Sequence, residues 1–255
     1  MSSVVIVTGA AGNLGRRLVP HLVSRGHTVR PVDRAGTGHP DAVVADLSTP
    51  GPWSDAFAGA DTLVHLAGNG SSSALWTDLV GDNIDAVLLV LDAAARHGLR
   101  RVVLASSVWA SRGRWASGQP ITAGPADPGD NDYGMTKAFA ERALAAFVAV
   151  NPAVGIALRI GGRPPGDDRP IRLDDWEDSC WLGPQDFLDG ITRAVEVDIA
   201  GFQAVNLVSQ NPLGRWTLDE ATDVLGYIPQ QRYDPRPQPR VGRLRRLRDE
   251  FLRGP

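Results

Sequence analysis

The chain begins with a run of β-branched apolar residues that leads directly into a glycine-rich turn and then into a helical pattern. Residues 4–8 read VVIVT, residues 8–15 read TGAAGNLG, and Leu14, Leu18 and Leu22 follow at helical spacing. A short apolar run of this kind is typical of a buried parallel strand. A strand, glycine turn and helix start bring backbone N–H groups and a helix dipole to one point, where a pyrophosphate can bind. These residues therefore predict a parallel α/β fold with a nucleotide-binding turn.

Strand and helix patterns alternate along most of the chain, which predicts a Rossmann-type α/β fold with a doubly wound parallel sheet. The strand patterns cover 4–8, 28–32, 41–45, 61–66, 101–106, 154–160 and 204–208. The helical patterns cover 13–24, 83–96, 133–150 and 187–197. We expect one domain over residues 1–230, with a small C-terminal substrate-binding portion, and a Pro- and Arg-rich tail over 231–255. Loops at 111–130 and 161–185 follow strand ends, and we expect them to bind substrate.

Composition excludes several functions. The 255 residues carry a net charge of -3, which argues against nucleic acid as a partner. No apolar run approaches the roughly 20 residues of a membrane span, and the start lacks the basic region of a signal peptide. The single cysteine, Cys180, excludes an internal disulfide and a cysteine metal cluster, and no residue pattern predicts another metal site. We therefore expect a cytoplasmic protein that acts on a small molecule.

The turn and the second strand predict how a dinucleotide binds. Gly9 and Gly12 permit the close approach of a pyrophosphate, and Gly15 lets the helix pack closely. Asp33 ends the second strand, where a carboxylate hydrogen-bonds ribose hydroxyls and repels a 2′-phosphate, so NAD is favoured over NADP. Arg34 follows directly and could hold a 2′-phosphate.

A second pair of residues is placed to meet the adenine. Asp46 and Leu47 follow the third strand pattern. A helix cap in the DLSTP turn explains Asp46 equally well.

Tyr133 and Lys137 carry the strongest signal for catalysis. Their spacing of four residues puts both side chains on one face of a helix. A nearby ammonium lowers the pKa of a phenol, and lysine also reaches ribose hydroxyls as a compact charge. Lys137 is the only lysine among 26 basic residues. A composition that uses arginine elsewhere thus retains lysine beside a tyrosine, which favours a catalytic pair over a surface pair.

Strand ends supply further candidates. Ser106 and Ser107 end the fifth strand pattern, and Ser107 can hydrogen-bond the oxygen that Tyr133 deprotonates, although a serine there can also cap a loop. His65 ends the fourth pattern. We expect it to lie in the sheet with its ring bonded to backbone, because no second histidine or acid marks a metal site.

Several motifs occur in a fixed order: TGAAGNLG, Asp33, DL at 46–47, HLAG at 65–68, Asn83, SS at 106–107, YGMTK at 133–137 and LRIGG at 158–162. Over residues 3–230 the chain resembles the extended, or atypical, short-chain dehydrogenases/reductases of the NAD-dependent epimerase/dehydratase family. The resemblance implies an oxidoreductase with Ser107, Tyr133 and Lys137 as its catalytic triad. It implies that Asn83 shapes the site. It also implies that the following residues contact the cofactor: Asn13, Leu14, Leu66, Ala67, Gly68, Asn83, Ser106, Tyr133, Lys137 and Ile160.

Within that family the short C-terminal region is similar to that of the uronate dehydrogenases, which oxidise C1 of a sugar acid. Their pattern implies substrate contacts from residues after the fifth and sixth strands, and a carboxylate-binding arginine at Arg172. This chain departs from the pattern, with Val108 and Trp109 in place of polar residues and Gly162 in place of a serine. Ser71, Ser72 and Ser107 could still bond a substrate hydroxyl. These departures predict a less hydroxylated or differently shaped substrate.

Two alternatives remain open at this level. One is a sugar epimerase or dehydratase that keeps its NAD bound through the reaction. The other is a non-catalytic sensor of dinucleotides, although such proteins typically lose the Tyr-Lys pair. The family resemblance also implies a homodimer that pairs through the long helices at 83–97 and 133–150.

Overall fold

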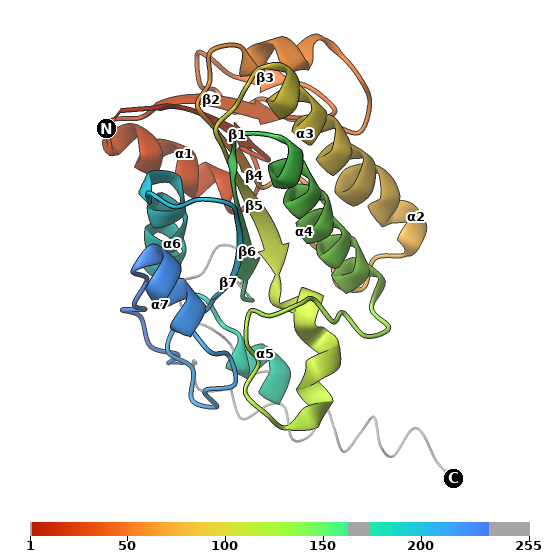
Figure 1. Ribbon diagram of the computed structural model, residues 1–255, viewed down its shortest axis with the longest axis vertical. Helices are drawn as coiled ribbons and strands as arrows, with labels where there is room; N and C mark the ends of the chain where they lie inside the picture. Colours follow the sequence, from red (N-terminus) through yellow and green to blue (C-terminus); the bar gives the residue numbers. More distant parts are fainter. Residues whose placement is uncertain (1, 163–173, 235–255) are drawn as a thin grey trace, which may run out of the picture.

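The computed structural model describes residues 2–162 and 174–234, which form a parallel sheet covered by helices on both faces (Figure 1). The sheet has seven strands in the order β3-β2-β1-β4-β5-β6-β7, all parallel. The strands are β1 (Val4–Thr8), β2 (Thr28–Asp33), β3 (Val43–Val44), β4 (Thr62–His65), β5 (Arg101–Ser107), β6 (Val154–Ile160) and β7 (Phe202–Leu207). The predicted doubly wound Rossmann-type sheet is confirmed.

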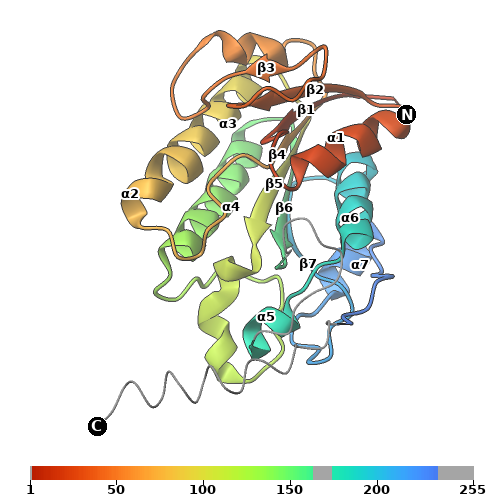
Figure 2. The ribbon, with the colours of Figure 1, turned by 180° about the vertical axis from the view of Figure 1, so that it is seen from behind.

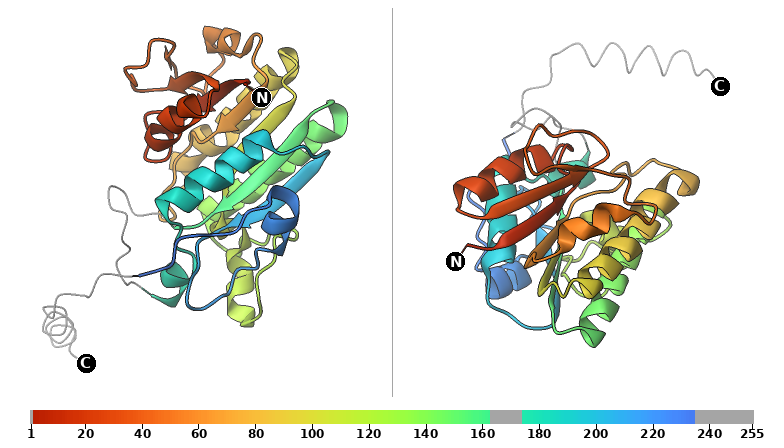
Figure 3. Two further views of the ribbon diagram at one scale, coloured as in Figure 1. Left: turned by 90° about the vertical axis from the view of Figure 1, so that its left-hand side faces the viewer. Right: turned by 90° about the horizontal axis from the view of Figure 1, so that it is seen from above.

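Two groups of helices sandwich the sheet. The helices are α1 (Gly15–Ser24), α2 (Trp76–Leu79), α3 (Ala86–Arg96), α4 (Asp132–Val150), α5 (Asp175–Ser179), α6 (Pro184–Glu196) and α7 (Asp219–Leu225). Helices α1, α6 and α7 cover one face, and α3 and α4 cover the other; the view from above in Figure 3 shows the sheet between them. Figure 2 shows α3 and α4 side by side from behind. No helix among the described residues is both long and apolar enough to traverse a bilayer.

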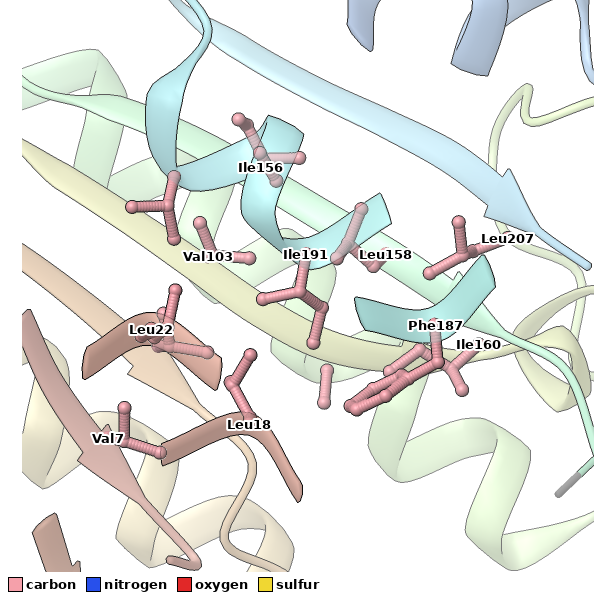
Figure 4. Close-up of a cluster of buried hydrophobic side chains, with 14 of the residues drawn as sticks. Val7, Leu18, Leu22, Val103, Ile156, Leu158, Ile160, Phe187, Ile191 and Leu207 are labelled. Carbon is pink, nitrogen blue, oxygen red and sulfur yellow. The ribbon is translucent and has the colours of Figure 1, made fainter. Parts of the chain in front are cut away.

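Each face of the sheet has its own apolar core. On the α1 and α6 side, Leu18 and Leu22 of α1 and Phe187 and Ile191 of α6 are fully buried against the strands (Figure 4). Their spacing of four residues puts each pair on one side of its helix, which is the amphipathic pattern that the sequence shows. Because strands buried on both faces must be apolar throughout, their sequences read as continuous runs.

The strand order reverses between β1 and β4. From β1 the chain crosses through α1 to β2 on one side, while β4 pairs with the other side of β1. In open parallel sheets ligands bind at the carboxyl ends of strands beside such a reversal. The glycine turn after β1 therefore lies where a cofactor cleft is expected.

Several local expectations need correction. The third strand shrinks from the expected 41–45 to Val43–Val44 because it lies at the sheet edge and is paired on one side only. The helix expected to start at residue 83 is preceded by α2 and a π-helical turn, Val80–Asp85. The first seven residues of the loop expected over 111–130 belong to a 3₁₀ segment, Val108–Ser117, whose start Ser107 caps. Helices α2, α5 and α7 were not predicted, and α5 lies within the loop expected over 161–185.

His65 lies in the sheet as expected, but a side chain bonds its ring rather than the backbone. Its Nδ1 lies 2.7 Å from the hydroxyl oxygen of Thr8, its partner in the β1–β4 register. Its Nε2 has no hydrogen-bond partner within residues 2–162 and 174–234. Burial, and secondarily the charge of Lys137, lower the pKa of His65 from 6.5 to about 3. The ring is therefore neutral at physiological pH.

This buried histidine predicts acid sensitivity. Between pH 6.5 and about 3 the unfolded chain protonates this imidazole and the folded chain does not, so the free energy of unfolding falls as pH falls, by up to about 1.4 kcal/mol per pH unit. Urea unfolding across that pH range should show a shallower slope for His65→Gln than for the wild type. A His97→Gln control, at the end of α3, should keep the wild-type slope. Equal slopes for wild type and His65→Gln would contradict the assignment.

Candidate active site

The glycine turn between β1 and α1 packs too tightly for any other residue at two positions. Gly9 has φ +69°, and a Cβ there would lie 2.6 Å from the backbone nitrogen of Ala67 on the adjoining strand end. A Cβ at Gly15 would collide with the carbonyl oxygen of Gly9. Among the residues that the structure describes, no side chain caps the N-terminus of α1. Its first N–H groups and the bare turn therefore suit a pyrophosphate, as the sequence predicts.

A cavity of about 290 Å³ opens beside this turn. It is lined by most of the predicted cofactor residues, namely Gly9, Gly12, Asp33, Arg34, Asp46, Leu47, Leu66, Ala67 and Gly68. Asp46 accepts hydrogen bonds from the backbone and hydroxyl of Ser48, so it caps its own turn while lining the cavity. The helix cap expected at Asp46 is not found, because the next helical segment starts at Pro52 with Gly51 as its N-cap. The place of Asp46 on the cavity wall agrees with the expected contact to the adenine.

Asp33 and Arg34 are held differently at the edge of this cavity. The carboxylate of Asp33 accepts hydrogen bonds of 2.9 Å from the backbone N–H groups of Ala11 and Ala35. The guanidinium of Arg34 forms an ion pair of 2.9 Å with Asp82. The acid is thus fixed by backbone, and the arginine is neutralised by a neighbouring carboxylate.

A second cavity, of about 270 Å³, adjoins the first through Leu66 and Gly68. It brings together Ser107 from the end of β5 and Tyr133 and Lys137 from the first turns of α4. Asn131 caps α4 by accepting a hydrogen bond from the backbone of Gly134. A Cβ at Gly134 would lie 2.5 Å from the carbonyl oxygen of Trp109, so glycine lets α4 approach the chain that follows Ser107.

Burial dominates the electrostatics of the catalytic pair. Burial raises the pKa of Tyr133, and a hydrogen bond with the Ser107 side chain offsets part of that rise. The lowering expected from Lys137 is not found. The Lys137 ammonium donates a hydrogen bond of 3.0 Å to the carbonyl of Ala105 and lies 5.6 Å from the centre of the Tyr133 ring. Burial also lowers the pKa of Lys137 to about 8, so this cation itself gives up its proton readily.

A buried ion pair lies directly behind these residues. Arg159 of β6 forms two hydrogen bonds with the carboxylate of Glu141, one turn after Lys137 on α4. Arg159 is 1% exposed and Glu141 is 5% exposed. Ser106 donates a hydrogen bond of 2.6 Å to Glu141, and Arg159 donates one of 2.9 Å to Ser111. The Ser106 hydroxyl was expected to contact the cofactor, but it donates its hydrogen bond to this network. Ser106 nevertheless lines the second cavity.

Other predicted residues fall into two groups. Asn13, Leu14, Val108, Trp109, Ile160 and Gly162 line the catalytic cavity. Asn83 lines neither cavity: its amide bonds the backbone of Asn69 and the hydroxyl of Thr136, so it ties the loop after β4 to α4.

The predicted serines and arginine are placed less directly. Ser71 bonds Ser73, and the carbonyl of Ser72 accepts a hydrogen bond from Asn131, so both stabilise their loop. Neither serine lines the two cavities. Arg172 lies outside the described residues.

Five residues that line the catalytic cavity were not predicted individually, namely Gly70, Ala105, Gly161, Glu177 and Cys180. The last three belong to the loop over 161–185 that was expected to bind substrate. Glu177 and Cys180 reach it from α5 and the residue that follows this helix. The strand pairing Gly162↔Trp181 brings this segment beside the end of β6. No local sequence pattern predicts this contact, because it depends on how residues that are far apart in the sequence pack together.

The buried network predicts a large cost for removing its charge. Glu141→Gln keeps the side-chain shape but leaves the Arg159 guanidinium unpaired, so we expect the free energy of unfolding to fall by about 3–5 kcal/mol in chemical denaturation. Asp92→Asn, which breaks an exposed ion pair with Arg96, should cost less than about 0.5 kcal/mol. A similar loss in both variants would contradict a structural role for Glu141.

Comparisons with known proteins agree with this geometry. Residues 5–161 match the sequence profile of the NAD dependent epimerase/dehydratase family. L-arabinose 1-dehydrogenase (NAD(P)(+)) of Haloferax volcanii is 32% identical over 244 residues, which cover 88% of this chain and 95% of that protein. Uronate dehydrogenase of Pseudomonas putida is 27% identical over 230 residues, which cover 88% and 83% of the two chains.

Solved structures give the same assignment. The glucuronic acid dehydrogenase of Chromohalobacter salexigens superposes with a TM-score of 0.81 at 28% identity, over 92% of this chain and 86% of that chain. The family match covers more than half of the chain and includes the turn, the strand ends and the catalytic helix. The chain therefore belongs to the NAD-dependent epimerase/dehydratase family.

Proposed function

We propose that this chain is an NAD-dependent sugar dehydrogenase that oxidises the C1 hydroxyl of a free sugar. The observation that carries the proposal is the meeting of Ser107, Tyr133 and Lys137 in a cavity that adjoins the dinucleotide cleft. The similarity to sugar dehydrogenases over most of the chain supports the same reaction class. The product at C1 of a cyclic sugar is a lactone.

The side chains divide the work of proton transfer. Tyr133 accepts the proton of the C1 hydroxyl, and Ser107 holds the reacting oxygen through a hydrogen bond. Lys137 lies 5.6 Å from the centre of the Tyr133 ring, and its pKa, lowered to about 8 by burial, lets it exchange protons near neutral pH. Bound NAD supplies the acceptor for the hydride that leaves C1, at C4 of its nicotinamide ring. In the reverse direction Tyr133 returns the proton to the carbonyl oxygen.

The residues at the adenosine end favour NAD over NADP. Asp33 places a carboxylate where a ribose hydroxyl can bond to it and where a 2′-phosphate would be repelled. Arg34, the residue that could have held that phosphate, is paired with Asp82. The position of Asp33 and the pairing of Arg34 therefore both favour NAD over NADP.

Two other functions make different predictions. An epimerase or dehydratase returns the hydride to its substrate, so it would release no net NADH. A non-catalytic sensor would not turn over any sugar. The L-arabinose 1-dehydrogenase and the uronate dehydrogenase of Pseudomonas putida each match over 88% of this chain, whereas a UDP-glucose 4-epimerase matches over 61% of it, which favours dehydrogenation.

We also propose that the chain forms a homodimer in the cytoplasm. The outer side of α3 and α4 exposes Leu88, Met135 and Phe139, and these apolar side chains offer a surface for a second copy. Its one cysteine precludes an internal disulfide, which suits a reducing compartment.

Tyr133→Phe tests the catalytic assignment. Without its phenolic oxygen the variant has no base at C1, so NADH production from sugars should fall by at least about a thousandfold. Calorimetric binding of NAD should change little, because the ring and Lys137 remain. Near-normal turnover in this variant would rule out the mechanism.

Light scattering tests the proposed dimer. The double substitution Leu88→Asp and Phe139→Asp puts charge on the apolar face and should convert the dimer to a monomer. Val23→Asp, at an exposed apolar position on the opposite face of the sheet, serves as the matched control and should stay dimeric. A wild-type chain that is monomeric at micromolar concentration would refute the pairing.

A further inference from the structure

The catalytic cavity contains a carboxylate that the proton-transfer chemistry does not use. Glu177 of α5 lines this cavity together with Ser107, Tyr133 and Gly162. Figure 1 shows α5 beyond the ends of β6 and β7. Its position makes it a candidate for contact with the substrate.

The carboxylate of Glu177 has no hydrogen-bond donor among the residues that the structure describes. Its backbone N–H bonds the side chain of Asp174, but its own side-chain oxygens accept no hydrogen bond from residues 2–162 or 174–234. Burial raises the pKa of Glu177, and the charges of Asp174 and Asp178 raise it further. A half-buried carboxylate without donors is costly to the fold, so it gains most from donors that a ligand brings.

The segment that carries Glu177 is fixed on both sides. The preceding residue, Trp176, is buried among three other tryptophans, with ring centres 5.2–5.4 Å away. After the helix, the backbone of Gly162 donates a hydrogen bond of 2.8 Å to the carbonyl of Cys180 and accepts one of 2.9 Å from Leu182. The carboxylate is therefore held in place by packing rather than carried on a free loop.

Gly162 leaves the carboxylate open to the cavity. A Cβ at this position would lie 3.4 Å from Oε2 of Glu177, so even a small side chain would touch this oxygen. Because Gly162 has no side chain, no atom of this residue covers that oxygen on the side of the cavity that both residues line.

The charges in the cavity determine which sugars fit. Among its described lining residues, Lys137 and Glu177 are the only charged ones, and Lys137 is placed beside Tyr133 at the reacting end. A neutral sugar brings hydroxyl donors to Glu177. A sugar acid brings a second carboxylate into the same small, partly dry space, where like charges repel strongly.

We propose that Glu177 is a specificity-determining residue that accepts hydrogen bonds from the hydroxyls of an uncharged aldose and excludes uronates. This inference rests on the proposed sugar dehydrogenase function. It assigns the substrate class of the same site: a neutral aldose is the substrate, and a sugar acid is discriminated against.

Matched sugar pairs test the inference. D-galactose and D-galacturonate differ only at C6, as do D-glucose and D-glucuronate, so each pair isolates the effect of the carboxylate. With NAD and the full chain, we expect kcat/KM from NADH absorbance to favour the neutral member by at least about tenfold. Glu177→Gln should reduce this ratio by at least about tenfold, because the amide keeps the shape and removes the charge.

Asp175→Asn provides the matched control. It removes the same charge from an exposed position on the same helix, outside the cavity, and should leave the ratio unchanged. Thermal melting of each variant reports whether the fold is retained.

Two results would overturn the inference while leaving the dehydrogenase function intact. The first is a wild-type kcat/KM for uronates equal to or above that for the neutral partners. The second is an unchanged ratio in a folded Glu177→Gln variant. If no sugar of either pair, nor L-arabinose, reduced NAD, the proposed function would fail and this inference with it.

Discussion

The buried ion pair between Glu141 and Arg159 connects the elements that supply the three proposed catalytic residues. Glu141 belongs to the helix of Tyr133 and Lys137, and Arg159 belongs to the strand next to that of Ser107. The same network includes Ser106, near the end of β5, and Ser111, in the 3₁₀ segment that follows this strand. A bidentate guanidinium–carboxylate contact holds the two side chains in one relative orientation. The start of α4 and the ends of β5 and β6 are thus held in one relative position, and this position sets the shape of the cavity that they line.

The three parts of the proposed site are stabilised by different kinds of interaction. The dinucleotide cleft uses backbone, with glycines that permit close approach and an uncapped helix start. The catalytic centre uses buried side chains, where low polarity shifts the pKa values of Tyr133 and Lys137. The region around Glu177 is anchored by tryptophans that pack edge to face outside the main sheet. Substrate choice can therefore vary without disturbing the chemistry.

Much of the fold was predictable because its signals are local. Apolar runs, helical spacing and glycine turns identified six of the seven strands closely, and the Tyr-Lys spacing identified the catalytic helix. The sequence predictions were wrong where contacts with residues distant in the sequence decide the local structure. Strand β3 is short because it lies at an edge, the segment after Ser107 is helical because its tryptophans pack, and His65 bonds Thr8 because the two are paired across the sheet.

The amino-acid pattern alone determined the class of fold and predicted the glycine turn, Tyr133 and Lys137 as parts of the site, because each follows from residues within a few positions of one another. Tertiary structure decided the rest. Glu141 meets Arg159 across 18 residues, and Glu177 meets Gly162 across a strand pairing formed after β6. Burial, not neighbouring charge, sets the pKa of Tyr133, and burial exists only once the chain is packed.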